Sequence, residues 1–131
     1  MVIVTTHKGS DFDAMASLVA ATLLYPGAKP VLPTSINGNL KTFLSIHKDL
    51  FDFYSPADIS LDHVKKLVVV DTHSWDRLEG LDKLRDRKDL EIVVWDHHTE
   101  GDMDASERHV VETGATVTLI INELKNHRTL I

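Results

Sequence analysis

The chain has 131 residues, the length of one ordinary domain, and 43% of them are hydrophobic and 26% charged. It contains no cysteine, which excludes disulfide scaffolds, thiolate zinc sites, iron–sulfur clusters and cysteine nucleophiles. Twenty acidic against fourteen basic residues give a formal charge of −6, which disfavours sequence-independent binding of nucleic acid through a basic face.

Apolar, β-rich runs alternate with helical patterns, which predicts an α/β fold: a three-layer, Rossmann-like open parallel sheet with crossover helices. In chain order, the patterns predict a strand over residues 2–6, a helix over 14–24, a strand over 29–33, a helix over 37–50, a strand over 67–71, a short helix over 78–84, a strand over 91–95, a short strand over 110–111 and a terminal helix over 115–125. Residues 51–60 are ambiguous. The apolar runs are far shorter than the roughly 20 residues of a membrane span, and the N-terminus lacks the basic region of a signal peptide, so we expect a cytoplasmic protein.

Aspartates and histidines follow three of the predicted strands. Ligands of open parallel sheets bind outside the carboxyl ends of the strands, where neighbouring loops diverge. If these three strands are neighbours, their polar residues form one cluster at that edge of the sheet. The cluster would comprise His7, Asp11 and Asp13 after the first strand, Asp71 after the strand at 67–71, and Asp96, His97 and His98 after the strand at 91–95.

Four carboxylates packed together repel one another unless cations or protons intervene, so the cluster predicts a metal site. Carboxylate and imidazole ligands without thiolates suit Mn²⁺, Mg²⁺, Fe²⁺ or Zn²⁺. Seven candidates exceed the needs of one ion, so two ions bridged by a shared aspartate are plausible. Taken singly, each group has an ordinary alternative: Asp71 as a turn former, Asp11 or Asp13 as a helix cap, and the two adjacent histidines as a satisfied pair on a turn.

Three segments carry a family resemblance. His7-Lys-Gly-Ser-Asp11-Phe-Asp13-Ala resembles the first motif of the DHH phosphoesterases, Val-Val-Val-Asp71 their second, and Asp96-His97-His98 the motif that gives the family its name. The order, the spacing and the predicted strand context all agree, over essentially the whole chain. Further segments resemble the DHH modules of bacterial proteins that continue into CBS domains and a poly(A)-polymerase-type tRNA nucleotidyltransferase: Asn39 to His47, Glu100-Gly-Asp and Gly114-Ala-Thr-Val-Thr118.

The resemblance implies two Mn²⁺ ions, with Mg²⁺ as an alternative, and hydrolysis of a phosphodiester or phosphoanhydride bond. One ion would be held by His7, Asp11 and Asp71, and the other by Asp13, Asp71 and His97. His98 would face the substrate phosphate as an orienting donor or general acid, while Asp96 would steady the histidines. Substrates in the family include short oligonucleotides, cyclic dinucleotides and polyphosphate, so we expect a phosphate ester such as a nucleotide, an oligonucleotide or an RNA end.

The sequence departs from the family at its end, where a fourth motif with a further aspartate and a substrate-binding domain are missing. We therefore expect residues 1–131 to be a DHH domain from the front of a longer protein, with further domains in the same chain. Asp102 or Asp104 could substitute as a ligand, although a loop or capping role suits them better.

Several other residues are secondary candidates. Arg77 could contact phosphate, or pair with Asp76 or Glu79 on a solvated surface. Lys8 could neutralise substrate charge but fits a surface role better. A helix start at Gly114 could offer backbone N–H groups to a phosphate, with capping by Thr113 as the simpler role. The remaining histidines are expected at the surface or in packing, except that the role of His73 stays open: His47, His63, His109 and His127.

Three functions follow from these observations. The leading hypothesis is a two-metal phosphoesterase module. The alternative is a catalytically weak nucleotide-binding, RNA-binding or regulatory module of a nucleotidyltransferase polypeptide. A phospho-receiver domain also has acidic residues after its first strand, but His7 and the Asp96-His97-His98 segment have no purpose there.

Overall fold

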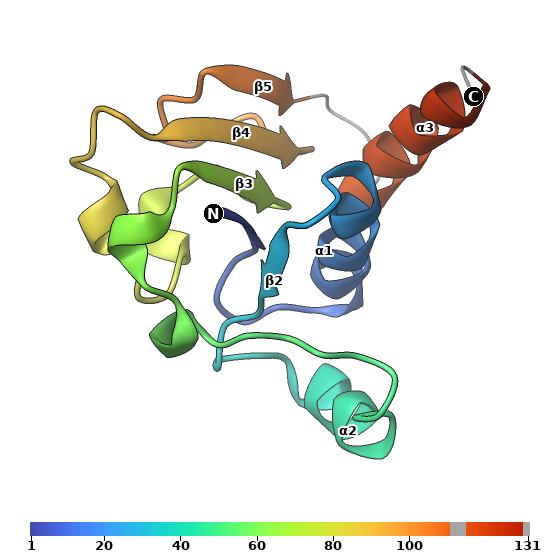
Figure 1. Ribbon diagram of the computed structural model, residues 1–131. Helices are drawn as coiled ribbons and strands as arrows, with labels where there is room; N and C mark the ends of the chain where they lie inside the picture. The colour runs from blue at the N-terminus through green and yellow to red at the C-terminus, as the bar shows by residue number, and fades with distance from the viewer. Residues whose placement is uncertain (111–114, 130–131) are drawn as a thin grey trace.

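The computed structural model describes residues 1–110 and 115–129, which build one five-stranded sheet (Figure 1). All neighbouring strands are parallel, in the order β2-β1-β3-β4-β5. This confirms the predicted α/β class with an open parallel sheet. The strands are β1 (Val2–Thr5), β2 (Lys29–Val31), β3 (Lys66–Val70), β4 (Glu91–Asp96) and β5 (Glu107–Val110).

Both faces of the sheet are covered, which explains why β3 and β4 are apolar along their length. Helices α1 (Phe12–Leu24) and α3 (Thr116–Thr129) lie together on one face (Figure 1). On that face Leu18 of α1 and Ile120 of α3 pack in one cluster with Val68 of β3. The opposite face packs against the segments between β2 and β3 and between β3 and β4, so the three-layer arrangement is also confirmed.

The predicted helix at 78–84 is wrong. Two short 3-10 helices, Trp75–Arg77 and Asp82–Leu84, stand in its place, with Gly80 between them at a φ of 70°. A left-handed residue interrupts any α-helix, and glycine adopts it without strain. The three leucines of the pattern, at positions 78, 81 and 84, are nevertheless buried against the sheet, so their spacing correctly indicated burial.

The remaining differences concern the ends of elements. Helix α2 (Gly38–Ile46) is shorter than the predicted helix at 37–50, and it extends away from the sheet in Figure 1, with Leu40 as its one buried residue. The ambiguous segment 51–60 forms a bridge from Tyr54 to Val31 and a 3-10 helix, Pro56–Asp58. Strand β5 begins three residues before the predicted start at 110, while residue 111 lies outside the described residues.

The strand order creates a crevice at the centre of the sheet. From β1 the chain moves to β2 on one side and returns to β3 on the other, so the loops that follow β1 and β3 diverge. Such a switch point is where open α/β sheets bind ligands. No helix in the described part of the chain is long and apolar enough to cross a membrane.

Candidate metal centre

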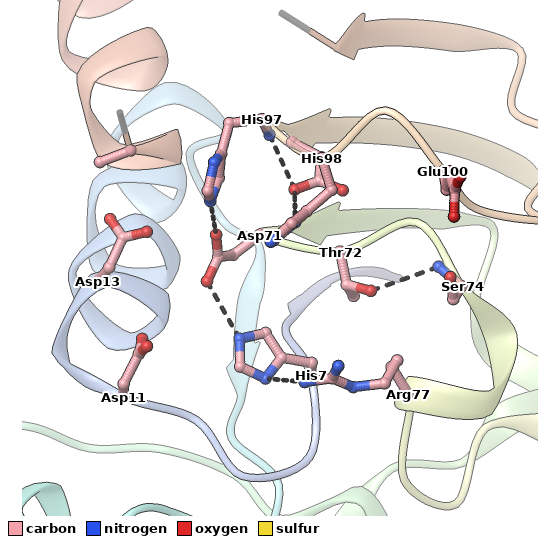
Figure 2. A pocket seen from close by; sticks show the side chains of 12 residues that line it. His7, Asp11, Asp13, Asp71, Thr72, Ser74, Arg77, His97, His98 and Glu100 are labelled. Carbon is pink, nitrogen blue, oxygen red and sulfur yellow. Dashed lines mark hydrogen bonds and ion pairs between the residues drawn. The ribbon is translucent and has the colours of Figure 1, made fainter. Parts of the chain in front are cut away.

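His7 follows β1 at the switch point and is largely buried. Its Nε2 lies 3.0 Å from Asp71 Oδ2 (Figure 2). Its Nδ1 lies 2.8 Å from the carbonyl oxygen of Lys8. Burial on its own would lower the pKa of His7. The hydrogen bonds to Asp71 and to the Lys8 carbonyl outweigh that effect and raise the pKa above its usual value of 6.5.

Asp71 follows β3 and lies at the centre of the site. Its Oδ2 faces His7, whereas its Oδ1 lies 3.1 Å from His97 Nε2 and accepts a hydrogen bond from the Thr116 hydroxyl over 3.1 Å. Burial would raise the pKa of Asp71, but the hydrogen bond and the charge of His7 lower it overall, with a further contribution from Thr116.

The backbone of Asp71 is also unusual. Its φ of 65° is the one positive value among the described residues other than glycine. A left-handed conformation at a residue with a side chain costs about 1–3 kcal/mol and persists only where the surroundings enforce it. The backbone N–H of Asp71 donates to the carbonyl of Trp95 over 2.8 Å, which anchors this turn to β4. Such strain is typical of functional sites, so it supports a functional role for Asp71.

Asp11 and Asp13 lie at the start of α1, where Figure 2 shows both side chains on the flank of the helix that faces Asp71. Asp11 is the N-cap residue, and its Oδ1 accepts a hydrogen bond from the N–H of Ala14 over 2.9 Å. The expected capping role therefore coexists with a place in the cluster. Oδ1 of Asp13 is buried and has no hydrogen-bond partner within residues 1–110 and 115–129. Burial, then the charge of Asp71, raises the pKa of Asp13.

Asp96 ends β4 and is completely buried. Its Oδ1 accepts hydrogen bonds from the backbone N–H of His97 over 2.8 Å and from His98 Nδ1 over 2.7 Å. Its Oδ2 lies 2.6 Å from Nδ1 of His73. Both oxygens of Asp96 are thus engaged by the segment that follows β4 and by His73.

One cavity of about 690 Å³ collects these groups. Every predicted site residue lines it, because the carboxyl ends of β1, β3 and β4 and the start of α1 meet there. The aspartates lie within reach of one another, and an uncompensated cluster of this kind is unfavourable. The lining comprises His7, Asp11, Asp13, Asp71, Thr72, Ser74, Arg77, Asp96, His97, His98, Glu100 and Ala115.

Two groups of side chains bring ligand atoms within 4.8 Å of one another, and Asp71 belongs to both. The first group, His7, Asp11 and Asp71, coincides with the predicted first set of ligands. The second consists of Asp71, Asp96, His97 and His98, and it omits Asp13. The oxygens of Asp96 already accept three hydrogen bonds, whereas the buried oxygen of Asp13 has none, so the chemistry favours Asp13 as the donor to a cation here.

Arg77 lines the cavity and is exposed to solvent there. Its guanidinium is 3.2 Å from His7 Nδ1, and no ion pair to Asp76 or Glu79 is found among the described residues. Glu79 instead accepts hydrogen bonds from Thr34 and Ser35.

Lys8, Asp102 and His109 do not line the cavity. Lys8 is exposed. Asp102 accepts a hydrogen bond from the N–H of Trp75, pairs with Arg85 and does not line the cavity, which fits the loop role. His109 stacks on the Trp95 ring, as expected of a packing residue. The predicted helix start at Thr113 and Gly114 and the side chain of His127 lie outside the described residues.

Sequence reasoning missed three contributions. The hydroxyl of Thr116 contacts Asp71, a role that the sequence did not indicate. Glu100 lines the cavity, although the family resemblance of the Glu100-Gly-Asp segment did not predict a place at the site. His73 contacts Asp96, and the only signal for it was its place two residues after Asp71.

Comparison with known proteins places this chain among longer relatives. It is 28% identical over 127 residues to the A-adding tRNA nucleotidyltransferase of Geobacter sulfurreducens, and 29% identical over 123 residues to that of Aquifex aeolicus. These matches cover 95% and 94% of this chain but only 14% of each relative.

The fold is shared with an exopolyphosphatase-related protein from Bacteroides fragilis of known structure. The TM-score is 0.73 at 13% identity, over 95% of this chain and 39% of the other, so the likeness concerns the fold alone. The model of the "DHH family, N-terminal domain" matches residues 1–129. Because that match spans nearly the entire sequence, this chain belongs to the DHH family as an N-terminal domain.

Proposed function

We propose that this chain is a two-metal phosphoesterase module that hydrolyses phosphodiester or phosphoanhydride bonds. The observation that carries the proposal is the position of Asp71, whose two carboxylate oxygens face His7 on one side and His97 on the other. A carboxylate that belongs to two ligand groups is the arrangement expected of a bridge between two cations. The strained backbone of Asp71 supports a functional reason for this placement.

The donor set fits two divalent cations. His7, Asp11 and Asp71 would hold the first, and Asp13, Asp71 and His97 the second. Mixed carboxylate and imidazole ligands suit Mn²⁺, Mg²⁺, Fe²⁺ or Zn²⁺, and the resemblance to DHH phosphoesterases favours Mn²⁺, with Mg²⁺ as an alternative. When bound, such a pair supplies a nucleophile from water at neutral pH and stabilises the charge of an in-line displacement at phosphorus. The unpartnered buried oxygen of Asp13 supports the fit, because a cation would satisfy it.

The residues around the cations would bind and orient the substrate. His98 keeps half of its side chain exposed in the cavity, and its Nδ1 is engaged by Asp96, so its Nε2 remains for the substrate. With both ring nitrogens protonated, Nε2 can donate to a phosphate oxygen or a leaving group, and in the neutral ring it can accept a proton. The guanidinium of Arg77 can bind a phosphate oxygen beside His7. Asp96 would act through the two histidines that follow it rather than on the substrate.

Asp71→Asn tests this function directly. Asparagine keeps the size of the side chain and tolerates a positive φ, while the bridging charge is lost. We expect hydrolysis of bis-p-nitrophenyl phosphate or a short oligonucleotide in Mn²⁺ to fall about 100-fold or more, since a bound cation contributes several kcal/mol. Asp82→Asn, at an exposed aspartate outside the cavity, is the matched control. Hydrolysis that persists unchanged in Asp71→Asn would remove the bridging role.

The alternative is a catalytically weak nucleotide-binding, RNA-binding or regulatory module of a longer cytoplasmic polypeptide. The names of the relatives favour this alternative, because both are A-adding tRNA nucleotidyltransferases. The chain spans 14% of the length of each. A DHH domain at the front of such a protein, with further domains behind it, would contribute binding to an RNA end. Metal binding without turnover, in this chain and in a longer protein that contains it, would favour this alternative.

A further inference from the structure

Three donors converge on the buried carboxylate of Asp96. The backbone N–H of His97 and Nδ1 of His98 share Oδ1, and Nδ1 of His73 faces Oδ2 at 2.6 Å. A carboxylate only accepts hydrogen bonds, so both rings must carry a proton on Nδ1. In their neutral forms His73 and His98 therefore have the same tautomer, and one residue, Asp96, sets it for both.

The buried ring of His73 makes one side-chain hydrogen bond among the described residues, to Asp96. Its side chain is 1% exposed, and its Nε2 is buried with no partner among the described residues. A buried nitrogen without a hydrogen bond is unfavourable, so packing alone would favour an apolar residue here. The hydrogen bond to Asp96 is what distinguishes histidine from such a residue.

The segment after β4 closes over the His73 ring. The N–H of Met103 donates to the carbonyl of His73 over 3.0 Å. A Cβ on Gly101 would overlap both the ring and that carbonyl, so only glycine allows the close approach. The ring is therefore held from both sides, by this segment and by Asp96, and cannot follow Asp96 if the carboxylate rotates.

We propose that His73 is a positioning residue, which acts through Asp96 to fix the tautomer and the orientation of His98. With Oδ2 held by His73, Oδ1 stays directed at His98, and Nε2 of His98 stays unprotonated and free for the cavity when the ring is neutral. The arrangement follows the logic of a base oriented by a carboxylate, with His73 as a further anchor behind it. The kinetic part of this inference rests on the proposed phosphoesterase function, whereas the tautomer part does not.

Two substitutions separate the hydrogen bond from the volume of the ring. His73→Asn places an amide N–H near the position of Nδ1 and can still donate to Asp96. His73→Leu fills a similar volume with no donor. Nitrogen-15 spectra of the imidazoles, recorded at about pH 8 where an ordinary histidine is neutral, report the tautomer of His98 in the metal-free protein.

We expect His98 to carry its proton on Nδ1 in the original protein and in His73→Asn, and to become a mixture of tautomers in His73→Leu. An unchanged tautomer in His73→Leu would overturn the inference. This measurement needs neither metal nor turnover, so it decides the role of His73 even if the chain proves to have no hydrolytic activity, which would instead count against the proposed function.

Kinetics in Mn²⁺ provide the second readout. His73→Leu should lower kcat roughly 10- to 100-fold, as losses of residues behind a functional side chain do, with KM little changed because substrate contacts remain. His73→Asn should retain most of kcat. Leu84→Ala truncates a buried leucine that does not line the cavity and serves as the control for lost stability, with kcat unchanged below its melting temperature. Equal losses of kcat in His73→Asn and His73→Leu would reduce the ring to a packing role and overturn the inference.

Discussion

The hydroxyl of Thr116 donates a hydrogen bond to Oδ1 of Asp71 over 3.1 Å, although 45 positions separate the two residues. Thr116 is the first residue of α3 and is fully buried. The bond therefore ties the last helix to the centre of the site. It also limits how the Oδ1 lone pairs can be directed, which matters for an oxygen that would face the second cation.

Thr116→Val should weaken that cation site while leaving the fold in place. Valine has the same shape, but it removes the donor to Asp71 and leaves a methyl group against a carboxylate. We expect Mn²⁺ affinity or kcat to fall roughly 10-fold or more, as for other residues that orient a ligand, measured by calorimetry and by hydrolysis of a phosphodiester. Thr118→Val, at an exposed position of the same helix, is the matched control. Identical affinities for both variants would show that the hydroxyl does not orient Asp71.

The two proposed cation sites should fill unequally. The ligand atoms of His7, Asp11 and Asp71 already lie within 4.8 Å of one another, so little reorganisation precedes binding there. Burial and the charge of Asp71 raise the pKa of Asp13, so protons compete with a cation for this carboxylate more strongly than for an ordinary aspartate. Calorimetry with Mn²⁺ should therefore show one tighter and one weaker site. Asp13→Asn should abolish the weaker alone; two sites of equal affinity in the original protein would contradict the order.

The sequence predicted the cluster because its logic is topological. Parallel strands end at one edge of the sheet, so the polar residues after β1, β3 and β4 had to meet once these strands were neighbours. Arg77 was left open between the site and the surface, because its direction depends on a 3-10 turn that the pattern did not predict. The leucine spacing at 78–84 indicated burial correctly. Burial does not specify the backbone hydrogen bonds of an α-helix, however, and the positive φ of Gly80 interrupts them.

His73 and Thr116 could not have been found in this way. Each acquires its role from a segment distant in the sequence: His73 from Asp96 and the loop that contains Gly101, and Thr116 from the docking of α3 on α1. No spacing rule encodes such contacts. They stabilise the orientation of groups that topology had already brought together, so they depend on packing.

The metal-free protein should be most stable in mildly acidic solution. The raised pKa of His7 contributes stability that is complete below about pH 6.5 and is lost as the pH rises through its folded value. The lowered pKa of Asp71 contributes stability above about pH 3.8, lost as the pH falls through its folded value. The raised pKa of Asp13 contributes stability below about pH 3.8, and this stability is lost as the pH rises through the folded value.

Urea unfolding at several pH values measures this dependence. The free energy of unfolding of the metal-free protein should be larger at about pH 5 than at about pH 8. His7→Gln should flatten the decline at higher pH. Saturating Mn²⁺ should reverse the trend, because ligands that lose protons bind cations better and binding to the folded state stabilises it. A metal-free protein whose stability does not change between these pH values would contradict the assigned directions.

Two glycines provide a paired test of how closely the chain packs behind the site. At Gly101 a Cβ would overlap the ring and the carbonyl of His73, so Gly101→Ala must displace the loop after β4 or the ring itself. Overpacking of this kind costs about 1–3 kcal/mol. At Gly38, the first residue of α2, a Cβ meets no atom within 4 Å.

Alanine at Gly38 should therefore stabilise the protein by up to about 1 kcal/mol, since it lowers the entropy of the unfolded chain and favours the helix. Urea unfolding of both variants should move the midpoint in opposite directions. Because Gly101 touches the residue that holds Asp96, Gly101→Ala should also disturb the tautomer of His98, which Gly38→Ala should leave intact. If both alanine variants were as stable as the original protein, the loop after β4 would not pack closely on His73. That result would also contradict the proposed role of His73 in holding Asp96.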